Sequence, residues 1–435
     1  MNPFIVPVTI AGTENLAEIV ERMGMRGKME SRPVAETVEE ILRSVRDSGD
    51  EALVEYTARF DHVRLAPGGF RVSGEEIEQA CAAMAPAVME ALRRAADNVL
   101  SFHRQGLPAG FRRDDGAGAV TGVLIRPLDT VGIYVPGGTA PLPSSVLMNV
   151  LPARAAGVRR IVMCTPPSRD GSVHPAILAA ARVAGATEIY RIGGAQAIAA
   201  MAYGTASIPR VDKICGPGNI YVNTAKRMVF GQVDIDLFAG PSEILVIADE
   251  TADPEYIAAD MLSQAEHDVL ASAILVTTSG GIAKKTAECL RTRAALLPRR
   301  DIVERALADF AAILVVPDLD IAADFANALA PEHLEICTAD PEALLPRIVN
   351  AGAVFLGDYS PEPLGDYFAG PNHVLPTSGT ARFFSPLNAS DFLKRINIIQ
   401  YTRAALESCR ADVELLAESE GLQAHAEAIR ARFAR

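Results

Sequence analysis

Apolar residues recur at intervals of three and four positions in two early stretches of the chain, Val34 to Phe60 and Gly74 to His103. This spacing places the apolar side chains on one face of an α-helix, and the alanine and glutamate residues between them favour helix as well. The pattern therefore predicts that residues 34 to 104 are mostly helical and pack through one face against another part of the protein.

From about residue 121 the pattern changes to short apolar runs that alternate with helical segments. A first series contains GVLIRPL, VGIYVPG, IVMCTPP, EIYRIGG and VDKICGPG. A second series begins at residue 243 and contains EILVIADE, SAILVTTS, AAILVVPD, LEICTAD and AVFLGDY, with amphipathic segments such as Pro254 to Glu266 and Ile321 to Leu329 between them. Such alternation is typical of parallel strands joined by helices, so the sequence predicts two α/β domains with largely parallel sheets.

The strand pattern fades beyond Gly379, and Ser390 to Arg435 is predicted to be helical. We therefore expect small helical units at both ends of the chain around the two α/β domains. The expected parts are an N-terminal arm (1–30), a helical segment packing with the second α/β domain (31–126), the first α/β domain (127–236), the second (237–382) and a C-terminal helical tail (383–435).

Composition narrows the class of protein. The chain has 435 residues, of which 49% are hydrophobic and 22% charged, as in ordinary globular proteins. Its formal net charge of −13 argues against nucleic acid and anionic membrane surfaces as partners. The longest uncharged stretch, Thr130 to Ala153, is interrupted by prolines and glycines and is not a membrane span. Met1 to Arg22 has no basic head followed by an apolar core, so we expect a cytoplasmic protein.

The cysteines give no sign of a zinc site. Six cysteines are spread along the chain without a C-x-x-C pair, which argues against both a disulfide framework and thiolate ligands.

Histidine, amide and carboxylate side chains offer a different metal site. His267 follows Gln264 by three positions at the end of a predicted helix, so both can project towards one point. Asp366 and His373 lie in a segment that follows the strand-like AVFLGDY, where we expect a loop at the carboxyl ends of parallel strands. His425 could join them if the tail docks there. Such donors suit zinc or a similar divalent ion, although four unrelated surface residues would give the same spacing.

Glu332 and His333 are adjacent in APEHLE, directly before the apolar run LEIC. Neighbouring side chains diverge, so the pair can act on two different protons. An imidazole can accept a hydroxyl proton while the carboxylate deprotonates water. A charge pair at a helix end is the alternative interpretation.

Glycines gather in YVPGGTAP, IGGAQA and CGPGN, each between a strand-like and a helix-like segment. Such turns can direct backbone N–H groups at phosphate oxygens. The dinucleotide fingerprint G-x-G-x-x-G is missing, and the turns could equally be strand ends alone. Ser242 in AGPSE could cap its turn or contact a ligand.

Taken together, these motifs resemble those of the histidinol dehydrogenase family. The resemblance rests on YVPGGTAPLPSSVLMN, GGAQAIAA, VDKICGPGN, AGPSE, MLSQAEHD, APEHLE, GDY, GPNHVLPT and the C-terminal GLQAHAEAI, in this order from roughly residue 30 onwards. It implies two incomplete Rossmann-like domains, which agrees with the missing fingerprint.

The resemblance also implies an activity and its site. Members oxidise L-histidinol to L-histidine in two NAD-linked steps through an aldehyde, the last step of histidine biosynthesis, as homodimers with one zinc per subunit. It implies that His333 accepts the alcohol proton, that Glu332 activates water, and that the tail of the partner subunit completes the site. By the same resemblance, the zinc ligands are Gln264, His267, Asp366 and His425; the substrate contacts are these four, His333, Ser242, His373 and Glu420; and the NAD contacts are Tyr134, Gln196 and Asn219.

Three alternatives remain at this point. One is a related zinc and NAD enzyme for another primary alcohol, such as a sulfonated diol. Glu420 disfavours an anionic substrate of this kind because a carboxylate attracts a cationic one. The others are a zinc hydrolase in which Glu332 activates water without a redox step, and a binding protein without catalysis.

Overall fold

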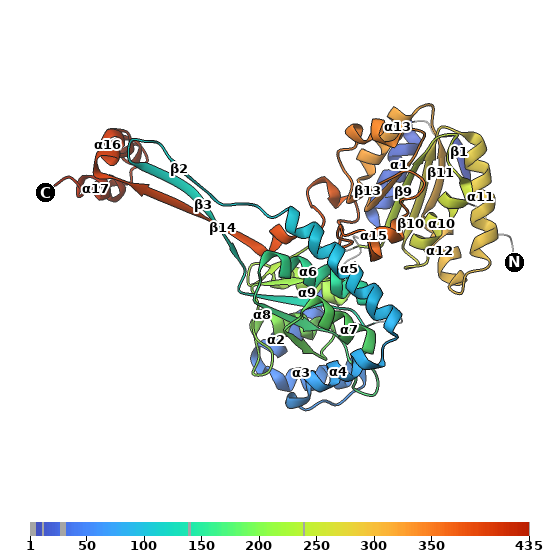
Figure 1. The fold of residues 1–435 in the computed structure, drawn as a ribbon, viewed down its shortest axis with the longest axis horizontal. Helices are drawn as coiled ribbons and strands as arrows, with labels where there is room; N and C mark the ends of the chain where they lie inside the picture. The colour runs from blue at the N-terminus through green and yellow to red at the C-terminus, as the bar shows by residue number, and fades with distance from the viewer. Residues whose placement is uncertain (1–5, 11–12, 27–31, 138–140, 238–239, 435) are drawn as a thin grey trace.

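The chain forms two lobes, each built on a parallel sheet, and a long arm that projects from them (Figure 1). A computed structural model describes residues 6–10, 13–26, 32–137, 141–237 and 240–434. The two parallel sheets confirm the predicted pair of α/β domains.

The first lobe contains a five-stranded parallel sheet in the order β6-β5-β4-β7-β8. Helices cover both faces, and the early helices of the chain contribute to this cover. The strands are β4 (Thr130–Tyr134), β5 (Arg160–Cys164), β6 (Glu188–Tyr190), β7 (Lys213–Cys215) and β8 (Asp234–Ile235). The helices are α2 (Arg32–Ser48), α3 (Asp50–Tyr56), α4 (Gly74–Ala83), α5 (Pro86–Gln105), α6 (Pro143–Ala156), α7 (Pro175–Ala184), α8 (Gly194–Tyr203) and α9 (Ile220–Val229), with short turns at Thr57–Asp61 and Pro67–Gly69.

The second lobe contains a six-stranded parallel sheet in the order β1-β11-β10-β9-β12-β13. The strands are β1 (Val8–Ile10), β9 (Glu243–Ala248), β10 (Ser272–Thr277), β11 (Ala311–Val315), β12 (His333–Cys337) and β13 (Ala353–Leu356). The helices are α1 (Thr13–Met25), α10 (Pro254–Ala265), α11 (Gly280–Ala294), α12 (Arg300–Phe310), α13 (Leu319–Leu329), α14 (Pro341–Leu344) and α15 (Glu362–Tyr367), with short helical turns at Leu345–Arg347 and Thr380–Arg382. The turn Ala389–Phe392 packs instead on α6 of the first lobe. The described part of the expected N-terminal arm therefore belongs to this lobe, because β1 pairs with β11 and α1 packs on α13.

The arm is an antiparallel ribbon that ends in two helices. Strands β2 (Phe111–Asp114) and β14 (Leu393–Tyr401) pair with the two edges of β3 (Ala119–Pro127). Helices α16 (Arg403–Ser419) and α17 (Gln423–Arg430) lie at its tip, far from both lobes, together with the C-terminus (Figure 1).

Three expectations are wrong. The tail is not wholly helical, because β14 is a nine-residue strand. GVLIRPL does not begin the first parallel sheet, because β3 belongs to the arm. The early helices pack mainly on the first lobe and not on the second α/β domain: α2 contacts α8 and α9, while α4 and α5 contact α7 and α6. Helix α5 also touches the second domain, where Asn98 donates to the Phe368 carbonyl oxygen (2.9 Å).

Local sequence explains where the early helices break. Gly49 separates α2 from α3 with a φ of 56°, a conformation that glycine adopts at little cost. Pro86 begins α5 at a position where the missing N–H leaves no bond unmade. Ser73 caps α4 with a reciprocal hydrogen-bond pair to Glu76. Each predicted long helix is thus two successive helices.

Among the described residues, no helix is both long and apolar enough to cross a bilayer.

Candidate active site

The predicted catalytic pair lies at the amino end of the six-stranded sheet. His333 is the first residue of β12 and Glu332 directly precedes it, while Ser242 and Glu243 stand at the start of the neighbouring strand β9. The expectation of a site at the carboxyl ends of the strands is therefore wrong. Helix α15 follows β13 but returns along the sheet, and the Glu362 N–H donates to Glu335 on β12 (2.8 Å).

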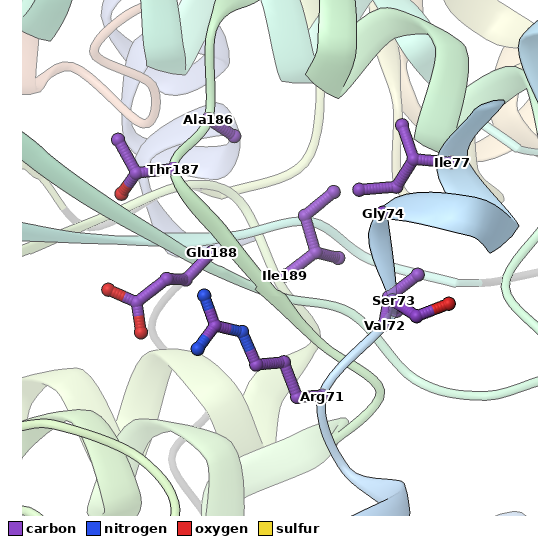
Figure 2. A pocket seen from close by; sticks show the side chains of 9 residues that line it. All are labelled: Arg71, Val72, Ser73, Gly74, Ile77, Ala186, Thr187, Glu188 and Ile189. Atoms are coloured by element: carbon purple, nitrogen blue, oxygen red, sulfur yellow. The ribbon is translucent and has the colours of Figure 1, made fainter.

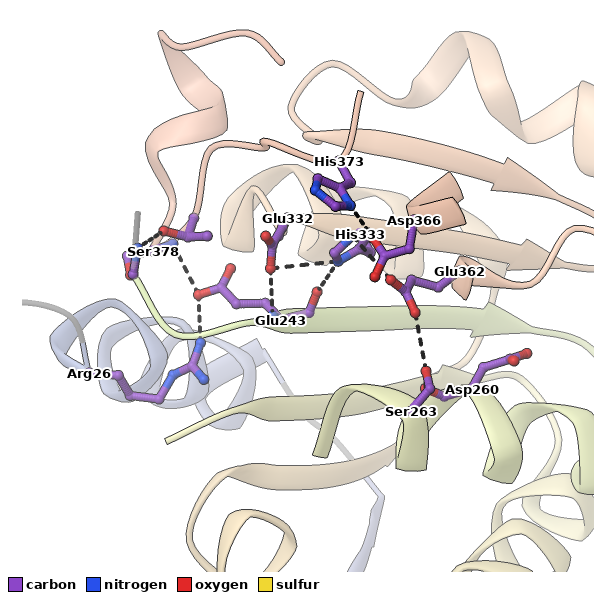
Figure 3. Close-up of polar contacts among 12 residues, drawn as sticks. Arg26, Glu243, Asp260, Ser263, Glu332, His333, Glu362, Asp366, His373 and Ser378 are labelled. Carbon is purple, nitrogen blue, oxygen red and sulfur yellow. Dashed lines mark hydrogen bonds and ion pairs between the residues drawn. The ribbon is translucent and has the colours of Figure 1, made fainter. Parts of the chain in front are cut away.

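The main chain of Glu243 contacts both members of the pair (Figure 3). Its N–H donates to Glu332 Oε2 (2.8 Å), and its carbonyl oxygen lies 2.9 Å from His333 Nδ1. Because a carbonyl only accepts hydrogen bonds, Nδ1 must carry the proton, and Nε2 keeps its lone pair. The two side chains thus bind the two main-chain polar groups of the same residue, and Glu332 Oε2 lies 3.6 Å from His333 Nδ1.

Burial sets the charges of this pair. It lowers the pKa of His333 to about 4, opposed by the nearby Asp366 carboxylate, so the imidazole is neutral near pH 7. Burial also raises the pKa of Glu332 well above its usual value, and the negative charge of Glu243 adds to this rise. A neutral imidazole and a carboxyl group of raised pKa are groups that exchange protons with a substrate.

The predicted metal and substrate residues of the second lobe gather beside the pair. His373 Nδ1 lies 3.3 Å from Asp366 Oδ1, and His267 lies near enough to Asp366 for the two charges to interact. Burial opposes ionisation of Asp366, but the His373 hydrogen bond and the surrounding histidines hold its pKa below the usual value. Gln264 lies in the last turn of α10 with its side chain buried, and His267 follows just after the helix ends.

Glu362 is a member of this cluster that the sequence analysis missed. Its Oε1 lies 3.6 Å from His333 Nε2, and its Oε2 accepts a hydrogen bond from Ser263 (3.2 Å; Figure 3). Burial and the Asp366 charge raise its pKa to about 8. Ligand atoms of His333, Glu362 and Asp366 lie within 4.8 Å of one another. The available signal was its position four residues before Asp366, one turn earlier on a short helix.

A cavity of about 210 Å³ opens onto this cluster. Its wall combines polar residues of the site with apolar residues of β13 and α15, so it can enclose a small molecule with both kinds of group. The lining residues include His333, Phe355, Leu364, Asp366, Asn372 and His373. Asn372 also donates to the Met148 carbonyl oxygen on α6 (2.6 Å), which places the cavity next to the contact between the lobes.

The three predicted cofactor residues lie at the carboxyl end of the five-stranded sheet. Tyr134 ends β4, Asn219 caps α9 after β7, and Gln196 is in the first turn of α8 after β6. The Tyr134 hydroxyl accepts the Gly194 N–H (3.0 Å), and both polar atoms of the buried Gln196 amide lack a hydrogen-bond partner among the described residues. In open α/β sheets this end, where the strand order reverses, is the usual ligand site.

A buried ion pair holds the glycine turn between β7 and α9. Lys226 pairs with Asp236, and the side chains of both are 1% exposed. The Gly216 N–H donates to Asp236 Oδ2 (2.7 Å), and Lys226 Nζ donates to the Gly216 carbonyl oxygen (2.9 Å). Gly216 has a φ of 119°, and a Cβ there would overlap the Tyr134 carbonyl oxygen. The turn therefore needs glycine and lies directly against β4.

His425 and Glu420 are not brought to this cluster within one chain. Glu420 ends α16 and His425 lies on α17, both exposed at the tip of the arm, which the ribbon holds away from the lobes (Figure 1).

Another hollow, of about 420 Å³, lies between α4 and β6 (Figure 2). Arg71 lies near the Glu188 carboxylate, whose pKa is held down first by its hydrogen bond with Arg160. None of the described residues that line this hollow is a predicted site residue, and the charges there compensate one another. The hollow is lined by Arg71, Val72, Ser73, Gly74, Ile77, Ala186, Thr187, Glu188 and Ile189.

Comparison with known proteins gives consistent matches. A family model described as histidinol dehydrogenase matches residues 25–433. A histidinol dehydrogenase of Heliobacterium mobile is 55% identical over 400 residues, covering 92% of this chain and 94% of the relative. One of Listeria innocua is 53% identical over 425 residues, covering 98% and 99%. The crystal structure of histidinol dehydrogenase from Elizabethkingia anophelis superposes with a TM-score of 0.93 at 37% identity, covering 98% of each chain.

Proposed function

The chain belongs to the histidinol dehydrogenase family, and from this premise we propose that it oxidises L-histidinol to L-histidine in two NAD-dependent steps through L-histidinaldehyde. The comparisons give no support to the alternative of a sulfonated diol as substrate. The observation that carries the proposal is the orientation of Glu332 and His333 by the main-chain N–H and carbonyl of one residue, Glu243, beside a cavity lined by His333, Asp366 and His373.

In the first step, His333 Nε2 would accept the hydroxyl proton of histidinol. Its lone pair is free because the Glu243 carbonyl holds the proton on Nδ1, and burial keeps the ring neutral. As the O–H bond breaks, the oxygen electrons form the carbonyl of the aldehyde and the hydride leaves the carbon. Bound NAD would accept the hydride in this and the following oxidation.

In the second step, Glu332 would remove a proton from the water that attacks the aldehyde. The ionised carboxylate is the form that accepts this proton, and it is a stronger base when the pKa of its acid is raised, as burial and the Glu243 charge raise that of Glu332. Because Glu332 keeps the proton of the water, the product is the hydrate anion, which would lose the second hydride to NAD and become the acid. Ser242 and His373 lie on the same side of the lobe and would hold the substrate.

The donors of this cluster fit zinc. Gln264 is buried, and neither polar atom of its amide meets hydrogen-bond geometry with another described residue, which is costly unless a ligand satisfies it. Gln264, His267 and Asp366 would hold the ion together with His425 of the partner subunit, in a set without thiolate. Bound zinc would anchor the nitrogen atoms of histidinol and so fix the orientation of the alcohol.

The arm supports a homodimer in which the tail of each chain reaches the other chain's site. Ile399, Leu415 and Leu416 are 77%, 66% and 65% exposed. A thin ribbon and two helices have no core of their own in which to bury such large apolar side chains. Docking on a second copy would cover them. Glu420 and His425 would then enter the partner's site, where a carboxylate favours the cationic ammonium of histidinol over an anionic substrate.

NAD would bind at the carboxyl end of the five-stranded sheet, against Tyr134, Gln196 and Asn219. The buried Gln196 amide, which has no hydrogen-bond partner among the described residues, offers polar groups to a ligand. The Gly216 turn lies directly against the main chain of Tyr134.

This placement predicts a specific effect of adding one methyl group. Gly216→Ala is expected to raise the KM for NAD and to lower the melting temperature, because a strained φ alone costs about 1–3 kcal/mol and the Cβ also displaces Tyr134. Gly231→Ala is the matched control, since Gly231 has a φ of 96° but open space around it. It should lower the melting temperature without changing the KM for NAD. Equal KM values in both variants would argue against NAD at this turn.

The proposal is tested by the absorbance of NADH. Histidinol and NAD added to the zinc-loaded enzyme should give NADH, a chelator should abolish the signal, and added zinc should restore it. A zinc hydrolase or a binding protein would give no NADH, and an enzyme for another alcohol would give it only with that alcohol. Absence of NADH with histidinol in a zinc-loaded dimer would contradict the proposal.

A further inference from the structure

Behind the catalytic pair lies an ion pair that the mechanism does not use. Arg26, just beyond the end of α1, places Nη2 2.5 Å from Glu243 Oε1 (Figure 3). The two side chains are 1% and 5% exposed, so the pair is removed from water and joins parts of the chain that are 217 residues apart.

The same Glu243 orients both catalytic groups through its main chain. Its N–H is bound by Glu332 and its carbonyl oxygen by His333, as described above. Any rotation or displacement of residue 243 would therefore move the carboxylate and the imidazole together, and would also disturb the bond that keeps the His333 proton on Nδ1.

Three further hydrogen bonds hold this residue and its partner in place. The Ser378 N–H donates to the same Glu243 Oε1 (3.0 Å). Arg26 donates through Nη1 to the Leu270 carbonyl oxygen (2.7 Å) and through Nε to that of Met23 (3.3 Å). The planar guanidinium thus fixes the end of α1, the loop before β10 and the start of β9 at once, which the single ammonium of a lysine cannot do.

The chemistry of the site explains the need for such an anchor. A buried carboxylate without a partner is strongly unfavourable and would pull in water or turn away. Burial raises the pKa of the Glu243 carboxyl, and Arg26 and the Ser378 N–H oppose this rise.

We propose that Arg26 is a positioning residue for catalysis: it anchors the Glu243 side chain, so that the peptide groups of Glu243 hold Glu332 and His333 in their working orientation. This inference rests on the proposed function, because it presupposes the roles of that pair. It makes the N-terminal helix a part of the catalytic apparatus although α1 lines no part of the site cavity among the described residues.

The test compares Arg26→Met with Arg26→Lys and with a control, Arg22→Met, which changes an exposed arginine on α1 four residues before Arg26. Arg26→Met should lower the single-turnover rate of the first NADH formation by about 10- to 100-fold, the scale of a small misplacement of catalytic groups. The KM for NAD and the zinc content should stay at their original values, since neither site contains Arg26. Arg26→Lys should lower this rate by a smaller factor, and Arg22→Met should leave it unchanged.

A double-variant cycle with His333→Asn separates positioning from a general loss of structure. If Arg26 acts through His333, then Arg26→Met should change the first-step rate less than about 3-fold once His333 is absent, because residues that act as a unit are not additive. A full, multiplicative loss in the double variant would overturn the proposal, as would a near-normal rate for Arg26→Met. If Arg26→Met does not fold, Arg26→Lys takes its place in the same cycle, with the same two outcomes.

The cycle also distinguishes this inference from the proposed function. If the first-step rate is low in His333→Asn but near normal in Arg26→Met, only the positioning role of Arg26 is overturned. A near-normal rate in the His333→Asn single variant overturns both the role of His333 as a base and the positioning role of Arg26.

Discussion

His333→Asn is expected to lower turnover by about 10²- to 10⁴-fold, the usual contribution of a general base. Asparagine can still donate a hydrogen bond to the Glu243 carbonyl oxygen, which now lies 2.9 Å from His333 Nδ1, so the local structure should persist. What disappears is the lone pair of Nε2. Steady-state turnover measures the effect, and circular dichroism confirms folding. Near-normal turnover would contradict the role of His333 as the general base.

A matched change at Glu332 should affect the other half of the reaction. In Glu332→Gln the side-chain oxygen can still accept the Glu243 N–H, but the group can no longer take a proton from water. We expect the first NADH to form at close to the normal rate and the second to be slow, so that aldehyde accumulates. Equal slowing of both steps would contradict the assignment of His333 to the first oxidation and of Glu332 to the second.

His425→Asn is expected to abolish zinc binding and to lower turnover by more than the roughly 10- to 100-fold seen when an outer-shell partner of a metal ligand is removed. The effect is large because His425 would be a direct ligand, although it lies at the tip of the arm, far from the other ligands of its own chain (Figure 1). Zinc content by atomic absorption and turnover measure it. Gln423→Ala, an exposed change at the start of α17, is the control and should retain both. Full zinc content in His425→Asn would exclude it as a ligand.

The sequence predicts the parallel sheets well because their strands are buried on both faces. In β9, Ile244, Leu245, Val246 and Ile247 are all at most 1% exposed, so the run is continuously apolar. The arm has no such signal. In β14 the apolar residues are mixed irregularly with Lys394, Arg395, Asn397 and Gln400, and most of the strand is exposed. Its partner strand is β3, more than 260 residues earlier. Long-range pairing of this kind leaves no local periodicity.

The site divides in the same way. Glu332 and His333 are recognisable because they adjoin an apolar strand, and Asp366 and His373 because they are close in sequence and prove close in space. Glu243, Glu362 and Arg26 were missed, since their roles arise from contacts between distant segments. The end of the sheet was also mispredicted, because α15 folds back from the carboxyl end of β13 to the amino end of β12.

The central claim is that each active site combines the catalytic pair of one chain with His425 of the partner subunit. Mixing His333→Asn chains with His425→Asn chains tests it most directly. In a heterodimer with crossing tails, the site built on the His425→Asn chain has its own His333 and receives His425 of the partner subunit. We predict that purified heterodimers regain about half the turnover of the original dimer, because one of two sites is intact. Heterodimers no more active than either parent would contradict the claim.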